Sequence, residues 1–207
     1  MNRNYVPIFL EPSNLRIIVF GGGNVALRKC TYFQDAKLTV VAREILPELE
    51  SIAAETIIED IPDDVTQMID PYDMVIAATD DKKLNDRIRD DAIRMGVSVN
   101  SAHGGGNVLI PSVLERESYT VAVSSQGRVP AFPPYMVKEL DSFLDGRYDR
   151  MMDLMIEVRE YAMGHIPTQK ERRRFLESVI YDPDIGSAVA KGDMEKAKEL
   201  ALKKVNE

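Results

Sequence analysis

Blocks of apolar residues alternate with helical patterns along roughly the first half of the chain. Short apolar runs predict strands at 16–20, 38–41, 56–59, 74–79 and 97–99. Apolar residues at helical spacing predict helices at 24–34, 46–54 and 80–95. Strands that alternate with helices in this way are typical of an α/β fold with a parallel, doubly wound sheet and right-handed crossovers.

The pattern changes after Ser101. Apolar runs at 108–115 and 119–125 predict two antiparallel strands joined by a short turn. Five helical patterns follow, at 135–144, 148–163, 168–180, 184–191 and 194–205. The sequence therefore predicts a nucleotide-binding domain over 1–112, a β-hairpin with one helix over 113–146, and an all-helical C-terminal domain over 147–207. The edges of such a hairpin need covering, and strand exchange with a second copy would cover them, so we expect a homodimer.

Composition narrows the class of protein. Apolar residues make up 44% of the chain and charged residues 29%, as in soluble globular proteins. The net charge of −8 argues against nucleic acid or an acidic membrane as a partner. We find no signal-peptide pattern and no apolar run of membrane-spanning length, so we expect a cytoplasmic protein. The single cysteine, Cys30, excludes an intrachain disulfide and a cysteine-based metal site.

A glycine-rich turn follows the first strand. The spacing Gly21-x-Gly23-x-x-Ala26 lies between an apolar strand and a helical pattern, and it fits the dinucleotide-binding motif. Gly21 would permit the tight turn, Gly23 would let the backbone approach a pyrophosphate, and Ala26 would let the helix pack on the strand. This context predicts a Rossmann-like domain that binds a nucleotide. The alternative is a tight turn that merely needs glycines.

Two further strand ends offer cofactor contacts. Glu44 lies about twenty residues after Gly23, where an acidic residue would bind the ribose hydroxyls of NAD. Arg43 beside it would instead suit the 2′-phosphate of NADP, and both can equally be solvated charges. Thr79 ends a strand at the edge where ligands bind in such sheets. Its alternative role is a helix N-cap, for which Asp80 competes.

Three polar segments outside the glycine turn are candidates for chemistry. His103, in a loop with Gly104, Gly105 and Gly106, can exchange a proton near neutral pH or can be a surface histidine. Ser124, Ser125 and Arg128 lie at the end of a strand and would suit a carboxylate-rich substrate, or form a turn that binds nothing. The basic run at 170–174 is typical of a solvated helix face but can attract a polyanion. The sequence suggests no catalytic triad, and two histidines cannot build a His-rich metal site.

The order of these pieces resembles the bifunctional precorrin-2 dehydrogenase/sirohydrochlorin ferrochelatase family, also found as the N-terminal part of sirohaem synthases. The resemblance spans nearly the whole chain. It is carried by the segments Pro7–Leu10, Val19–Lys29, Leu38–Ala42, Ile76–Asp81, Leu84–Asn85, Val99–Asn100, Ile110–Ser112, Val121–Gly127 and Arg172–Phe175.

The resemblance implies both a fold and an activity. It implies a Rossmann-type domain, a dimerisation region with exchanged strands, and a helical C-terminal region. It also implies NAD-dependent oxidation of precorrin-2 to sirohydrochlorin, a tetrapyrrole, followed in some members by Fe²⁺ insertion. By the same resemblance, Asn24 and Val25 match cofactor-binding positions, as do Arg43 and Glu44. Ser125 matches a serine near the substrate site.

The chain departs from the family at a catalytic position. The family has an aspartate three residues after the position of Asn100, where this chain has His103. Arg128 and Val129 also replace a small-Ser pair before Pro130. A histidine can accept a proton, but it cannot supply the negative charge that would draw in Fe²⁺. The sequence thus favours a dehydrogenase with His103 as its catalytic residue. The alternatives are a metal chelatase alone, or a catalytically silent regulator that binds a nucleotide or a tetrapyrrole.

Overall fold

The computed structural model describes residues 5–206, which divide into two compact units. The first unit comprises residues 5–110 together with 126–128. The second comprises residues 111–125 together with 129–206. The three-part division expected from the sequence, with boundaries at 112 and 146, stays a prediction.

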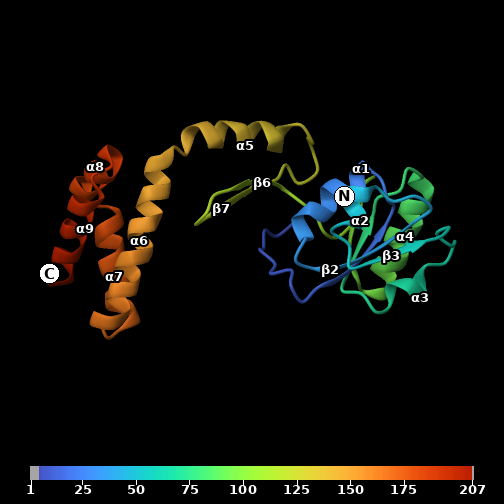
Figure 1. Cartoon of the computed structure of the whole chain (residues 1–207), viewed down its shortest axis with the longest axis horizontal. Coiled ribbons are helices and arrows are strands. Elements are labelled where there is room, and N and C mark those ends of the chain that lie inside the picture. Colours follow the sequence, from blue (N-terminus) through green and yellow to red (C-terminus); the bar gives the residue numbers. More distant parts are fainter. Residues whose placement is uncertain (1–4, 207) are drawn as a thin grey trace. The chain divides into compact units, whose positions relative to one another are not determined.

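A five-stranded parallel sheet forms the centre of the first unit (Figure 1). Its strands are β1 (Arg16–Phe20), β2 (Lys37–Ala42), β3 (Glu55–Ile58), β4 (Met74–Ala77) and β5 (Ser98–Ser101). They lie in the order β3-β2-β1-β4-β5, and every neighbouring pair is parallel. The order reverses between β1 and β4. Ligands of open α/β sheets bind at such a point, outside the carboxyl ends of the strands.

Helices cover both faces of this sheet. On one face lie α1 (Asn24–Cys30) and α2 (Pro47–Glu50), and on the other lie α3 (Thr66–Ile69) and α4 (Lys82–Met95). Strand β1 contributes side chains to the apolar cores on both faces, because its side chains point alternately to the two faces. All of its residues from Ile17 to Phe20 are buried, as expected of a central parallel strand. Burial of each large apolar side chain contributes about 1.5–3 kcal/mol.

The second unit begins with the predicted β-hairpin. Strands β6 (Ser112–Glu115) and β7 (Thr120–Val123) pair antiparallel, and α5 (Phe132–Phe143) packs on them. The Arg116 guanidinium joins the hairpin to the helix, since it donates to the Asp141 carboxylate at 2.8 Å and to the Leu144 carbonyl oxygen at 3.2 Å. Helix α5 starts earlier than the sequence predicted. Its prolines lie in the first turn, where no helical hydrogen bond is lost.

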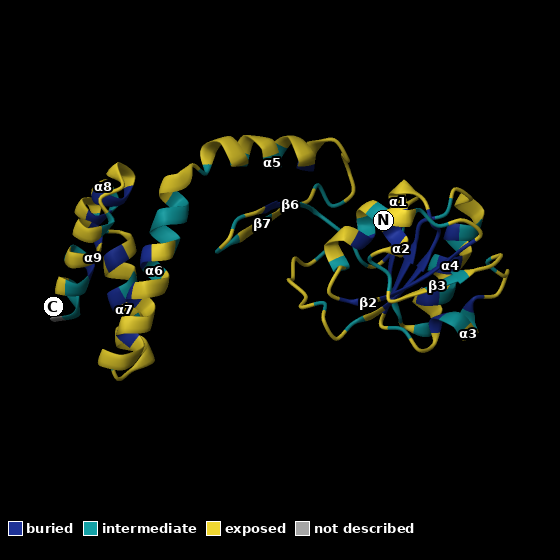
Figure 2. Cartoon of the chain, in the orientation of Figure 1, coloured by how far each residue is buried: buried dark blue, intermediate teal, exposed yellow. Residues whose placement is uncertain are grey.

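Four helices complete the second unit: α6 (Gly146–His165), α7 (Gln169–Ile180), α8 (Pro183–Lys191) and α9 (Met194–Lys203), followed by a short 3₁₀ turn at Lys204–Asn206. They bury a common apolar core and leave their outer faces exposed (Figure 2). The core is built from Leu154, Val158, Ala162, Phe175, Val179, Ile185, Ala188, Val189, Ala197 and Ala201. Asp145, Thr168, Asp182 and Asp193 cap the four helices, so each begins where the sequence supplies a capping oxygen.

The structure confirms the predicted fold class. A Rossmann-like parallel sheet is followed by a hairpin with one helix and then by an all-helical region. Over residues 5–206, no helix combines the length and apolar character needed to cross a membrane.

Candidate cofactor and substrate site

The glycine turn after β1 is held in place by close packing against β4. Gly21 has φ +118°, a conformation that other residues rarely adopt. A side chain on Gly21 would also lie 2.6 Å from the carbonyl carbon of Ala78 and 2.9 Å from the Thr79 nitrogen. Residue 21 must therefore be glycine for the turn to reach the end of β4.

The opposite is true of Gly23, which faces open space. It has an extended conformation, and a side chain there would meet nothing within 4 Å. Gly23 precedes α1, whose first turn carries no acidic residue, while Asn24 and Val25 beside it are exposed. Ala26 is fully buried against the sheet. The turn thus offers a dinucleotide an open backbone approach, and the residues present fit that group.

Arg43 and Glu44 lie where the sequence predicts the ribose contact. Both are exposed in the loop after β2, and the Leu46 N–H holds this loop to the glycine turn through the Gly22 carbonyl oxygen at 2.9 Å. The Arg43 guanidinium forms an ion pair with Asp60, a residue that follows β3. A 2′-phosphate at Arg43 would compete with Asp60 for this cation, whereas the ribose hydroxyls of NAD would not.

The end of β4 is organised by Asn85. The side-chain oxygen of Asn85 accepts from the Thr79 N–H at 3.0 Å and from the Thr79 hydroxyl at 2.8 Å. Neither Thr79 nor Asp80 caps the following helix. Asp81 does so, accepting from the N–H groups of Lys83 and Leu84, because α4 begins later than the sequence predicted. Thr79 lies at the predicted carboxyl edge, and its contact with a cofactor stays a prediction.

His103 lies in the loop after β5, which includes Gly104 and Gly105, both with positive φ. The ring is exposed, and its Nδ1 lies 2.9 Å from the Asn85 Nδ2. Asn85 thereby links the residue predicted to be catalytic to Thr79, at the carboxyl edge of the sheet. Asn85 is fully buried. It belongs to a segment that carries the family resemblance, but the helical pattern gave no sign of its contact with His103.

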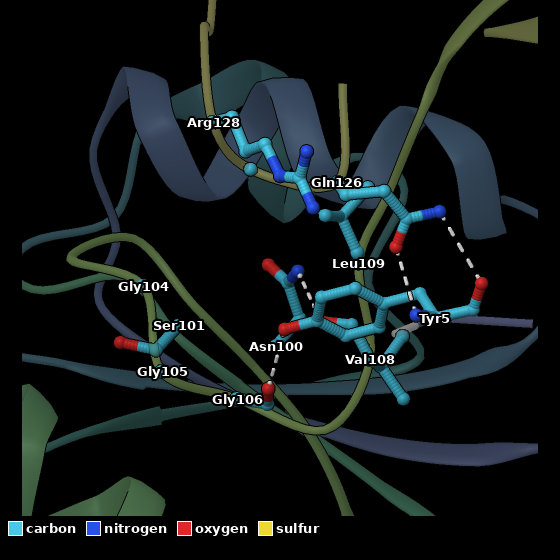
Figure 3. Close-up of a pocket in the computed structure, with 11 residues that line it drawn as sticks. Tyr5, Asn100, Ser101, Gly104, Gly105, Gly106, Val108, Leu109, Gln126 and Arg128 are labelled. Atoms are coloured by element: carbon cyan, nitrogen blue, oxygen red, sulfur yellow. Dashed lines mark hydrogen bonds between the residues drawn. The ribbon is translucent and has the colours of Figure 1, made fainter. Parts of the chain in front are cut away.

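A cavity of about 380 Å³ opens beside this loop, entirely within the first unit (Figure 3). It is lined by Tyr5, Asn100, Ser101, Gly104, Gly105, Gly106, Val108, Leu109, Gln126, Gly127 and Arg128. Of these, Arg128 is the charged residue and the others are neutral. The lining thus presents a cation and several hydrogen-bonding groups, which suits an anionic ligand.

Tyr5 occupies the middle of the cavity lining (Figure 3). Its hydroxyl donates to the Gly106 carbonyl oxygen at 2.9 Å, and its N–H donates to the Gln126 side-chain oxygen at 2.8 Å. The Gln126 amide nitrogen in turn donates to the Tyr5 carbonyl oxygen at 3.3 Å. These bonds connect positions far apart in the sequence, so the sequence pattern could not predict them.

The predicted substrate residues divide between the two units. Arg128 lines the cavity, whereas Ser124 and Ser125 are not among the lining residues and belong to the second unit. The Ser125 hydroxyl donates to the Val129 carbonyl oxygen at 3.0 Å and accepts from the Val129 N–H at 3.1 Å. Ser125 therefore closes the turn around Gln126 and Arg128. A substrate contact of either serine stays a prediction.

A lysine missed by the sequence interpretation lies next to the cavity. The Lys29 ammonium on α1 donates to the Asn100 side-chain oxygen, and the Asn100 amide nitrogen donates to the Val108 carbonyl oxygen at 3.0 Å. Burial lowers the pKa of Lys29, and the charge of Arg28 lowers it further. A partly buried cation thus supports one of the residues that line the cavity.

The basic run on α7 and the second histidine have structural partners. Arg172 donates to the carbonyl oxygens of Ile166 and Pro167 at 2.7 and 2.9 Å, which closes the end of α6. Arg173 pairs with Glu177 at 2.8 Å. His165 stacks on Tyr161 with ring centres 3.8 Å apart. Among the described residues, no group of three His, Cys, Asp or Glu side chains is arranged to hold a metal ion.

Two family models match the chain. Residues 8–112, about half of the chain, match a family described as putative NAD(P)-binding. Residues 147–204 match the sirohaem synthase dimerisation region. The first match covers the glycine turn and the end of β4, and the second covers α6 to α9.

Similar proteins span the chain from end to end. The "Siroheme synthase 3" of Aeromonas hydrophila subsp. hydrophila is 31% identical over 203 residues, which cover 96% of this chain and 43% of that protein. The "Precorrin-2 dehydrogenase" of Methanosarcina barkeri is 29% identical over 207 residues, covering 96% of this chain and 92% of that protein. The chain thus spans less than half the length of such synthases but nearly all of this dehydrogenase.

A solved structure shares the fold. "SirC, precorrin-2 dehydrogenase" superposes with a TM-score of 0.75 at 19% identity, covering 96% of this chain and 99% of that one. At this identity the likeness shows a shared fold and nothing beyond it.

Proposed function

The chain belongs to the family of precorrin-2 dehydrogenases and sirohaem synthases, and we propose that it oxidises precorrin-2 to sirohydrochlorin with NAD as hydride acceptor. One observation carries the proposal. The open backbone at Gly23 and the cationic cavity at Arg128 belong to the same compact unit, which also holds the carboxyl edge of the sheet. A dinucleotide and an anionic substrate can therefore be bound by one domain.

NAD supplies the chemistry of hydride acceptance when it is bound. In this proposal the turn from Gly21 to Val25 receives the pyrophosphate, and Glu44, with Arg43 beside it, binds the adenine ribose. Thr79 adds a contact at the end of β4. These residues would orient the dinucleotide, and His103 lies in the loop after β5, the strand next to β4.

The acetate and propionate groups of precorrin-2 need cationic partners. Arg128 is the charged residue of the cavity lining, and a guanidinium pairs with carboxylates through two parallel hydrogen bonds. In the proposal Ser124 and Ser125 are also substrate-binding residues, and His103 is the catalytic side chain. The aspartate-to-histidine change at residue 103 supports oxidation over iron insertion, since an imidazole brings no negative charge to an Fe²⁺ ion.

We also infer a homodimer, because the helical region matches a dimerisation family. The oligomer is tested by light scattering at micromolar concentration. A dimer is expected, and a monomer would contradict this part of the proposal. A cytoplasmic location follows from the reaction, which draws on the intracellular NAD pool.

The experiment that tests the proposal incubates the protein with precorrin-2 in parallel arms, with NAD, with Fe²⁺, and with both. We expect NADH and sirohydrochlorin to form whenever NAD is present, with or without the metal. A further arm supplies sirohydrochlorin and Fe²⁺ without NAD. Metal-dependent consumption of sirohydrochlorin in that arm, with no NADH formed from precorrin-2 in the others, would identify a chelatase instead. Binding of NAD or precorrin-2 with no turnover in any arm would identify a regulator.

A further inference from the structure

The Asn85 carboxamide joins the end of β4 to the His103 loop. Asn85 is fully buried on α4. Its oxygen accepts from the Thr79 N–H at 3.0 Å and from the Thr79 hydroxyl at 2.8 Å. Its nitrogen donates to the Thr79 carbonyl oxygen at 2.8 Å and lies 2.9 Å from His103 Nδ1. All the hydrogen-bonding positions of this amide are therefore occupied.

The backbone of Thr79 determines which way round the Asn85 amide lies. A backbone N–H can only donate and a backbone carbonyl can only accept. The amide oxygen must therefore face the Thr79 N–H, and the amide NH₂ must face the Thr79 carbonyl. That NH₂ group has only hydrogens to offer His103. The His103 Nδ1 is consequently the bare nitrogen of the neutral ring, the one that accepts.

We propose that Asn85 is a positioning residue that keeps the neutral His103 ring protonated on Nε2, so that the ring acts as a hydrogen-bond donor and not as a proton acceptor. A neutral imidazole has one N–H and one bare nitrogen. Because Asn85 holds the bare nitrogen, Nε2 has a hydrogen to donate and no lone pair to take a proton. The catalytic part of this inference rests on the proposed function, whereas the tautomer is a property of the protein alone.

His165 provides an internal reference for the tautomer. It is the other of the two histidines in the chain. Its Nδ1 lies 2.8 Å from the Tyr161 carbonyl oxygen, which can only accept. The neutral His165 ring must therefore carry its proton on Nδ1. The two histidines are expected to show opposite tautomers in one spectrum.

The test is ¹⁵N NMR of the full chain with labelled histidine, at about pH 8.5, roughly two units above the ordinary histidine pKa. The expected spectrum shows His103 protonated on Nε2 and His165 protonated on Nδ1. The His165→Gln variant, which keeps Asn85, identifies which signals belong to His103. A wild-type His103 protonated on Nδ1, or an even mixture of both forms, would overturn the inference without any further variant.

Asn85→Asp tests the cause of the tautomer. The new carboxylate can only accept, so it should draw the His103 proton to Nδ1 and leave Nε2 bare. The matched control is Asn107→Asp, which adds the same charge to the segment between β5 and β6 that also holds His103. The Asn107 oxygen accepts from the Val99 N–H at 2.6 Å. A tautomer that changes in the control, or stays unchanged in Asn85→Asp, would contradict the role of Asn85.

The rate of precorrin-2 oxidation by His103 variants shows whether His103 acts as a hydrogen-bond donor or as a base. A glutamine amide can donate from about the position of Nε2 but cannot take up a proton. We therefore expect His103→Gln to stay within about threefold of wild type and His103→Ala to lose about tenfold, the size of one hydrogen bond. Loss of about a hundredfold or more in both variants would identify a base and overturn the inference. The expected tautomers in a protein that does not oxidise precorrin-2 would instead refute the proposed function and leave the role of Asn85 standing.

Discussion

The Lys29 ammonium on α1 donates to the side-chain oxygen of Asn100, so a partly buried cation lies behind a residue that lines the cavity. This contact joins α1, the helix that follows the glycine turn, to the end of β5. Its electrostatic consequence is measurable, because burial lowers the pKa of Lys29 from the ordinary 10.5.

The lysine makes stability depend on pH in a defined direction. Between the lowered pKa and 10.5, the unfolded chain binds more protons at Lys29 than the folded chain does. The stability of wild type relative to Lys29→Met should therefore rise with pH through this window. Urea denaturation at a series of pH values measures the difference. Lys83→Met, at an exposed lysine, serves as the control for loss of a lysine. A difference in unfolding free energy between wild type and Lys29→Met that is constant or falls with pH would contradict the prediction.

Gly21 and Gly23 should respond to the same substitution in different ways. In Gly21→Ala the new methyl group would clash with the Ala78 carbonyl, and alanine would have to adopt a positive φ. We therefore expect a loss of at least about 2 kcal/mol in the free energy of unfolding. Gly23→Ala has room and an extended backbone, so stability should change by no more than about 1 kcal/mol.

The second variant should instead lose cofactor affinity. A methyl group at Gly23 would occupy the space that the pyrophosphate needs, and we expect NAD to bind at least about tenfold more weakly, or about 1.4 kcal/mol. Calorimetric titration with NAD measures this. Unchanged affinity in a folded Gly23→Ala protein would show that the dinucleotide does not approach this backbone.

Cys30 should be chemically silent in the folded protein. It is fully buried in the core between α1 and the sheet, and burial raises the pKa of its thiol to about 12. Because the thiolate is the reactive form, a disulfide reagent near pH 8 should label the thiol only after unfolding. Rapid labelling of the native chain would indicate that α1 opens away from the sheet.

Arg128 should control substrate affinity and not cofactor affinity. Arg128→Ala removes the cation of the cavity lining, and we expect KM for precorrin-2 to rise about tenfold or more, the size of a charge-assisted hydrogen bond. Arg128→Lys keeps the charge but not the paired geometry and should give an intermediate value. Arg147→Ala, on α6 in the second unit, is the control. An unchanged KM in Arg128→Ala would exclude this residue from substrate binding.

Strands and long helices were predictable because their patterns are local. The run at 16–20 coincides with β1, and the helical spacing of Leu84, Ile88 and Ala92 coincides with α4. The short α3 (Thr66–Ile69) was missed, since one turn of helix is too short to show a period. The start of α4 was predicted too early because several capping residues precede it. The hydrogen bonds that the Asp81 carboxylate accepts from the N–H groups of Lys83 and Leu84 show that Asp81 is the cap.

The candidate site was predictable only where a motif is contiguous. The glycine turn can be recognised in the sequence from the spacing of its glycines and from the apolar strand before it. Tyr5 with Gln126, Lys29 with Asn100, and Asn85 with His103 meet only after the chain has folded. The sequence thus identified His103 as the departure from the family but could not show that Asn85 holds one of its ring nitrogens.

Hydride transfer itself tests the central claim most directly. Precorrin-2 that carries deuterium on its reduced macrocycle carbons is incubated with the protein and NAD, and the nicotinamide product is analysed by mass spectrometry. We predict NADH that carries the deuterium at C4, formed in step with sirohydrochlorin. Sirohydrochlorin formed without labelled NADH, or no oxidation of precorrin-2 by a protein that binds NAD, would contradict the assignment as an NAD-dependent dehydrogenase.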